Sequence, residues 1–108
     1  MKDIMGSFVI RNEGDGCLTS KYLEHTSTVP FTECCIRKAS TVQEADDPFV
    51  GIYTTTWLEP GGRTSELIIQ RNGNVYSLNW DTISNTTIRY RGSAMLFENK
   101  LIGCYWDL

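Results

Sequence analysis

The chain has 108 residues, a net charge of −3, 41% hydrophobic residues and 21% charged residues. This length suits one globular domain, which can bury roughly two-thirds of the surface of its unfolded chain. The acidic balance supplies no basic field for phosphate or an anionic membrane, so we expect no nucleic-acid partner. No apolar run approaches the ~20 residues of a membrane helix. The N-terminal residues lack the pattern of a signal peptide, so we expect no membrane association and a cytoplasmic location.

The N-terminal part, about residues 6–38, predicts three strands. Ser7–Asn12 is followed by a turn at residues 13–16, whose two glycines can take positive φ. Cys17–Leu23 forms the returning strand, and a polar loop ending at Pro30 leads to a third strand at Phe31–Arg37.

Residues 39–48 are expected to form a linker or a single helical turn. Thr41 and Glu44 have the spacing of a capping box, whereas Asp46, Asp47 and Pro48 would end any helix quickly. The segment separates the N-terminal part from a C-terminal meander over residues 49–108. We expect both parts to belong to one domain spanning residues 1–108, because neither half alone could close a good core.

The strongest pattern in the chain is a hairpin over Glu66–Trp80. Asn72-Gly73 lies between two runs of β-branched and aromatic residues, which predicts a type I′ turn with positive φ at both central residues. The alternation after the turn places Tyr76, Leu78 and Trp80 on one face. A register slip of one residue would turn all three outward, so Asn72→Pro or Gly73→Val should damage folding.

Further strands are expected on both sides of this hairpin. Phe49–Trp57 precedes it, and Thr86–Arg91 follows it as a strand interrupted at Gly92. Residues 94–97 either continue this strand or begin the next one, and residues 101–106 form the last strand. We therefore predict an all-β fold, an antiparallel up-and-down meander that closes into a small barrel of about eight to nine strands. Closure would remove the bare edges of the meander and leave an interior that is filled by side chains or holds one small ligand.

The second half of the chain resembles the calycin-type barrels, the lipocalin-like and avidin-like groups. The residues that carry the resemblance are Gly51-Ile52-Tyr53, Trp57, Gly62, Leu67, Gly73, Tyr76–Trp80, Tyr90-Arg91-Gly92 and Leu101–Trp106. The resemblance covers residues 49–108 and implies a barrel that binds a small apolar or heterocyclic ligand in its mouth. Tyr53 stands where those families carry Trp, and no ligand residue of those families can be assigned to a position here.

Aromatic residues are the candidate ligand contacts, because small-molecule sites have mostly apolar walls. We expect a cavity, if one is present, to be lined by Tyr76 and Trp80, with Trp57 and Tyr90 as neighbours and Tyr53 as a further contact. The alternative is that these rings pack as barrel core, as do aromatic residues at alternate positions of most small barrels.

The polar residues give no catalytic or metal-binding motif. His25 is the single histidine, and the four cysteines have no Cys-x-x-Cys spacing, so no metal or cofactor is expected. Arg89 and Arg91 share a strand face and could pair with Glu66.

The remaining candidates also have ordinary structural interpretations. Asp46 and Asp47 are expected to be solvated. The cysteines are expected to be small buried residues, with Cys34 and Cys35 on opposite faces of a strand.

The function predicted from these patterns is that of a binding domain, not an enzyme. The partner would be a small apolar or aromatic ligand in the barrel interior. The alternative is a protein-interaction or homo-oligomerisation module with a filled barrel.

Overall fold

The computed structural model describes the whole chain except residues 1–4, 39–46, 59–61, 82 and 84–88. Its strands are β1 Met5–Gly14, β2 Cys17–Glu24, β3 Phe31–Arg37, β4 Gly51–Trp57, β5 Thr64–Asn72, β6 Val75–Asp81, β7 Tyr90–Phe97 and β8 Lys100–Asp107. Within these described ranges, no helix has the length and apolar character needed to cross a membrane.

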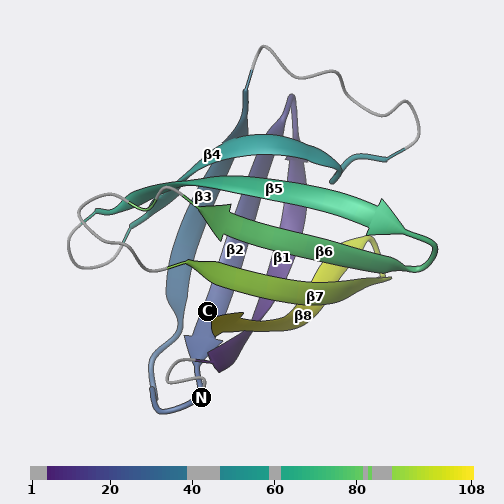
Figure 1. Ribbon diagram of the computed structural model, residues 1–108. Coiled ribbons are helices and arrows are strands. Elements are labelled where there is room, and N and C mark those ends of the chain that lie inside the picture. The colour runs from purple at the N-terminus through teal and green to yellow at the C-terminus, as the bar shows by residue number, and fades with distance from the viewer. Residues whose placement is uncertain (1–4, 39–46, 59–61, 82, 84–88) are drawn as a thin grey trace.

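The strands form a closed antiparallel barrel in the order of the sequence, from β1 to β8 (Figure 1). Each strand pairs with the next one along the chain, and β8 returns to pair with β1 from Met5↔Trp106 to Arg11↔Lys100. The predicted all-β up-and-down barrel is confirmed. Of the two alternatives for residues 94–97, continuation of the strand through Gly92 is confirmed, since β7 runs from Tyr90 to Phe97. The beginning of the predicted strand, at residues 86–88, lies outside the described residues.

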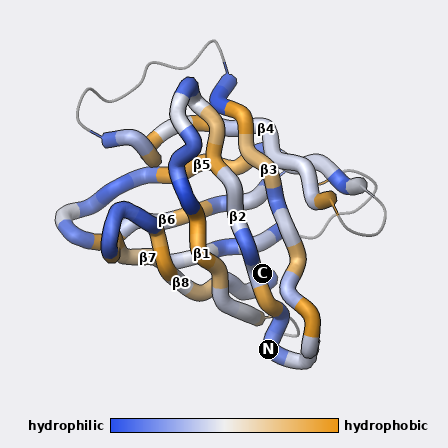
Figure 2. Tube along the Cα trace, turned by 180° about the vertical axis from the view of Figure 1, so that it is seen from behind, coloured by the Kyte–Doolittle hydropathy of each residue, from blue (hydrophilic) through white to orange (hydrophobic). Residues whose placement is uncertain are grey.

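Alternate residues of every strand face the interior, as the two-residue period of a strand requires. Figure 2 accordingly shows hydrophobic and hydrophilic residues interspersed along the strands. The buried hydrophobic residues are Phe8, Ile10, Leu18, Cys35, Phe49, Tyr53, Leu67, Ile69, Tyr76, Leu78, Trp80, Ala94, Leu101 and Tyr105. The predicted inward face of β6 is confirmed, because Tyr76, Leu78 and Trp80 are all buried while Val75 and Ser77 are exposed.

The β5–β6 turn differs from the predicted one in its centre and its type. Asn72 pairs with Val75, so the central residues are Gly73 and Asn74. Only Gly73 has positive φ, at 65°, which is the pattern of a type II′ turn. The predicted type I′ geometry occurs instead in the β7–β8 turn, where Glu98 and Asn99 have φ of 50° and 66°.

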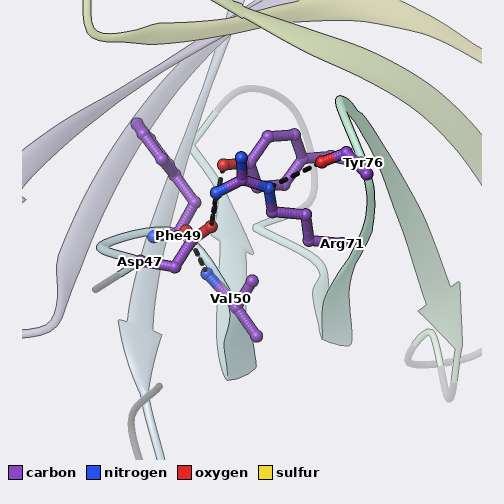
Figure 3. Close-up of polar contacts among 6 residues, drawn as sticks. Asp47, Phe49, Val50, Arg71 and Tyr76 are labelled. Carbon is purple, nitrogen blue, oxygen red and sulfur yellow. Dashed lines mark hydrogen bonds and ion pairs between the residues drawn. The ribbon is translucent and has the colours of Figure 1, made fainter. Parts of the chain in front are cut away.

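One end of the barrel, which we call the Asp47 end, is covered by the segment that leads into β4. The side chain of Asp47 is buried and accepts hydrogen bonds from the N–H groups of Phe49 (2.9 Å) and Val50 (3.2 Å). It also accepts one from the Tyr76 hydroxyl at 2.8 Å and forms an ion pair with Arg71 at 3.2 Å (Figure 3). Asp47 is thus structural, and the expectation that it is solvated is wrong.

Phe49, whose N–H donates to Asp47, packs into the core at this end of the barrel. Its ring is 1% exposed and packs edge-on against Tyr76 at 6.4 Å. The strand was predicted to begin at Phe49, but β4 begins at Gly51, so Phe49 and Val50 precede it. The predicted capping box of Thr41 and Glu44 lies outside the described residues.

The two turns give a matched test of backbone conformation. Gly73→Ala should destabilise the protein by about 1–2 kcal/mol, because positive φ is unfavourable for a residue with a Cβ. Glu98→Gly should be neutral or stabilise it by up to about 1 kcal/mol, because glycine relieves the same conflict. Urea denaturation monitored by tryptophan fluorescence measures both changes. A neutral Gly73→Ala would contradict the left-handed conformation at this turn.

Candidate functional site

The opposite end of the barrel, which we call the aromatic end, carries a connected set of rings. Trp57 contacts Tyr90 with ring centroids 6.4 Å apart, and Tyr90 contacts Tyr105 at 5.9 Å. Tyr105 in turn packs against Trp80 at 6.4 Å and Tyr22 at 6.0 Å. All four contacts are edge-on or steeply inclined, so in each of them the edge of one ring meets the face of the other.

These rings meet because each occupies an inward position near the same end of its strand. Trp80 lies deepest and is 5% exposed, whereas Trp57 and Tyr90 are only partly buried. Gly92 makes room for Trp80, since a Cβ at this position would lie 3.0 Å from the Trp80 ring and 3.2 Å from a backbone oxygen. The set therefore extends from the middle of the barrel to its surface.

A buried carboxyl lies beneath the rings. Glu33 occupies an inward position of β3 and is 2% exposed. The ring N–H of Trp80 donates a hydrogen bond of 2.9 Å to Glu33 Oε2. Because β4 and β5 separate β3 from β6 around the barrel, this bond crosses the interior.

Two buried hydroxyls flank Glu33. Ser20 is its register partner on β2, and Thr55 lies on β4 beside it. Within the described part of the chain, neither Ser20 Oγ nor Thr55 Oγ1 has a hydrogen-bond partner. Thr55 lies close enough to the Glu33 carboxyl to lower its pKa, although its Oγ1 forms no hydrogen bond of acceptable geometry with it. Unpaired buried hydroxyls are uncommon in a finished core and call for an explanation.

The electrostatics of this end follow from the burial of Glu33. Burial raises the pKa of Glu33 from 4.5 to about 7, although the hydrogen bond from Trp80 and the nearby Thr55 hydroxyl act in the opposite direction. The pKa of Tyr105 is raised to about 12, first by burial and then by the charges of Glu24, Tyr90 and Glu33. Burial, followed by the charge of Glu33, also raises the pKa of the Cys35 thiol.

The structure divides the predicted ligand residues between the two ends. Trp57, Trp80 and Tyr90 belong to the aromatic end. Tyr53 and Tyr76 lie at the Asp47 end, where the Tyr53 hydroxyl donates to the carbonyl of Phe49 at 2.8 Å. The predicted set is therefore not brought together around one point.

Sequence reasoning missed the polar members of the site, Ser20, Glu33 and Thr55. A signal was present, because the alternation that turns Cys35 inward also turns Glu33 inward. A charged residue at an inward strand position is the anomaly that could have identified the site.

The other predicted polar contacts are only partly found. Arg91 and Arg89 form ion pairs with Asp81 at 3.5 and 3.9 Å, and Glu66 pairs with Lys38, so the predicted pairing of Glu66 with Arg89 or Arg91 is wrong. The side chains of these pairs are partly exposed.

The cysteines and His25 form no site. All four cysteines are free, with Cys35 buried and Cys104 exposed, so the expectation that they are all buried is wrong. The backbone carbonyl of Met5 lies 2.8 Å from Nδ1 of the exposed His25. Among the described residues, no group of at least three His, Cys, Asp or Glu side chains could hold a metal ion.

Comparison of the chain with protein-family models, with curated proteins and with solved structures finds no match. The site must therefore be interpreted from its own geometry.

Glu33 should make stability depend on pH in a recognisable way. Its folded pKa is above its unfolded value, so folding is favoured by protonation, and this contribution is lost as the pH rises from about 4.5 to about 7. Glu33→Gln removes the ionisation and still accepts from Trp80. The variant should match the wild type near pH 4.5 and exceed its free energy of unfolding by about 3 kcal/mol at pH 8.

Chemical denaturation of both proteins at these two pH values measures the difference. If the difference in free energy of unfolding between the two proteins is the same at pH 4.5 and pH 8, Glu33 does not titrate between these pH values.

Proposed function

We propose that this protein binds a small organic ligand inside the aromatic end of its barrel, as the calycin-type barrels it resembles do. The supporting observation is the set of buried polar groups that the fold leaves incompletely paired: the Glu33 carboxyl and the hydroxyls of Ser20 and Thr55. Polar groups converging inside aromatic walls are typical of small-molecule sites.

Energetics favour a ligand over simple packing. Each buried hydroxyl without a partner costs about 1–3 kcal/mol, and valine at position 55 or alanine at position 20 would avoid that cost. The carboxyl of Glu33 adds a further cost, since an ionised group is expensive to bury. A ligand that hydrogen-bonds to these groups would offset all three costs.

The architecture favours one route to the site. The Asp47 end is filled by Phe49 and held by the hydrogen bonds of Asp47. At the aromatic end, Trp57, Tyr22 and Tyr90 are only partly buried and form the outer part of the ring set. We expect the ligand to enter there, with its polar group innermost.

Association with a second copy of the chain is a second candidate function. Val75, Met95, Phe97 and Ile102 are 52%, 58%, 57% and 37% exposed on β6, β7 and β8. Met95 pairs with Ile102 in register, so these side chains lie side by side on the outer surface. Glu98 and Lys100 carry opposite charges beside them, and a twofold arrangement could pair these charges across the interface.

Neighbouring threonines on β4 provide a matched test of the ligand site. Thr55→Val should stabilise the protein by about 1–2 kcal/mol, because it removes a buried unpaired hydroxyl, and should weaken ligand retention. Thr54→Val, on the exposed outer face, should change neither property. Native mass spectrometry of freshly purified protein measures retention, and urea denaturation measures stability. A Thr55→Val variant that is destabilised and retains ligand would contradict the proposal.

The second candidate is tested by light scattering at micromolar protein concentration. Self-association should be abolished by Met95→Lys, because a charge placed in an apolar interface must be desolvated. Ile36→Lys should have no effect, since Ile36 is 62% exposed on β3, away from these strands. A monomeric wild type would exclude this candidate.

A further inference from the structure

We propose that the ligand of the aromatic end carries a planar, positively charged head group, held by the Glu33 carboxylate below and by aromatic rings around it. The inference deepens the proposed function and depends on it. It specifies a chemical class, such as an amidinium or a protonated aminoheterocycle, in place of an apolar or aromatic ligand in general.

The first reason is that no cationic side chain pairs with Glu33 in the part of the chain that the structure describes. Among the described residues, no Arg, Lys or His forms an ion pair with its carboxyl. Arg37 lies on the inward face of the same strand, but its Nη2 donates to the carbonyl of Val50 at 2.9 Å and to the Tyr53 hydroxyl at 2.8 Å. The arginine is thus engaged at the Asp47 end, and the carboxyl is left for a ligand cation.

The second reason is the arrangement of acceptors. The hydroxyls of Ser20 and Thr55 are buried without partners on either side of the carboxyl, and each can accept a hydrogen bond. A planar cation with several N–H donors fits acceptors that converge from β2, β3 and β4. An anionic head group could accept from the two hydroxyls, but it would be repelled by the like charge of the Glu33 carboxylate between them.

The third reason is the charge around the rings. The pKa values of two neighbouring groups, Cys35 on the same strand and Tyr105 on β8, are raised first by burial, and the negative charge of Glu33 adds to both shifts. Glu24 acts on Tyr105 in the same sense.

The charged residues around Tyr90, at the outer part of the aromatic end, are of both signs and do not cancel the negative charge of Glu33. At Tyr90, the pKa is raised first by burial and then by Asp107, with Arg63 opposing and Glu24 adding to the rise. A cation is therefore attracted to the interior, and the faces of Trp57, Tyr90 and Tyr105 would stabilise it further by cation–π contact.

Cation binding should be coupled to proton release. Glu33 is partly protonated near neutral pH, because burial raises its pKa to about 7. A bound cation stabilises the carboxylate, so the proton leaves as the ligand enters. Affinity should therefore be constant above about pH 8 and fall by up to about tenfold per pH unit well below pH 7.

Calorimetric titration with three probes of one shape tests the assignment. Benzamidine is a planar cation across this pH range, benzamide is its neutral counterpart and benzoate is the anion. We expect saturable binding of benzamidine at millimolar concentration, at least about tenfold weaker binding of benzamide, and no binding of benzoate. Glu33→Gln should weaken benzamidine binding about tenfold or more and abolish proton release, measured in buffers of different ionisation enthalpy. Thr54→Val serves as the unaffected control.

Each other result overturns the assignment. Equal binding of benzamide and benzamidine, or benzamidine binding unaffected by Glu33→Gln or by pH between 5 and 8, excludes a cation held by Glu33. The proposed function then stands if Thr55→Val still weakens retention of the ligand that copurifies with the protein. Absence of saturable benzamidine binding also excludes a cationic ligand. The proposed function itself fails only if Thr55→Val leaves the retention of the copurifying ligand unchanged.

Discussion

Pairing of β8 with β1 is the constraint on which the rest of this structure depends. Seven consecutive register pairs, from Met5↔Trp106 to Arg11↔Lys100, convert a meander into a ring. A ring has no free edge, and every strand then has one inward and one outward face. This is why so short a chain can enclose a core, and why a single polar residue at an inward position is buried on all sides.

Two carboxyl side chains are buried in the described part of the chain, and their surroundings shift their pKa values in opposite directions. Asp47 receives N–H groups from Phe49 and Val50, the Tyr76 hydroxyl and Arg71, and these overcome the effect of burial so that its pKa is lowered. Glu33 receives the Trp80 ring N–H, and burial prevails so that its pKa is raised. The first arrangement is complete and stabilises the Asp47 end. The second is incomplete, which is what a site that awaits a ligand requires.

Local patterns were sufficient to predict most of the fold. Alternation on β6 predicted the inward face of Tyr76, Leu78 and Trp80, and strand spacing predicted the closed barrel. In the sequence, Gly92 interrupts a run of strand-forming residues and leaves open whether residues 94–97 continue the same strand. In the barrel it is instead the residue that leaves room for Trp80, a contact between strands that no local pattern reveals.

The site was less predictable for the same reason. Trp57, Trp80 and Tyr90 could be chosen as aromatic residues of a barrel, but their separation from Tyr53 and Tyr76 depends on which end of each strand they occupy. Asp47 and Arg71 lie far apart in sequence, and their contact depends on the path of the segment before β4. The unpaired state of Ser20 and Thr55 appears only when every neighbour is in place.

The pairing of Met5 with Trp106 has a topological consequence. It places the start of β1 and the end of β8 side by side at the aromatic end, so the outer ends of these two strands are neighbours. The strand pairing of the barrel therefore does not depend on which connection between neighbouring strands is open. A circular permutant that joins these ends and opens at Gly73-Asn74 would keep all eight strand ladders and move its new termini to the Asp47 end, away from the rings.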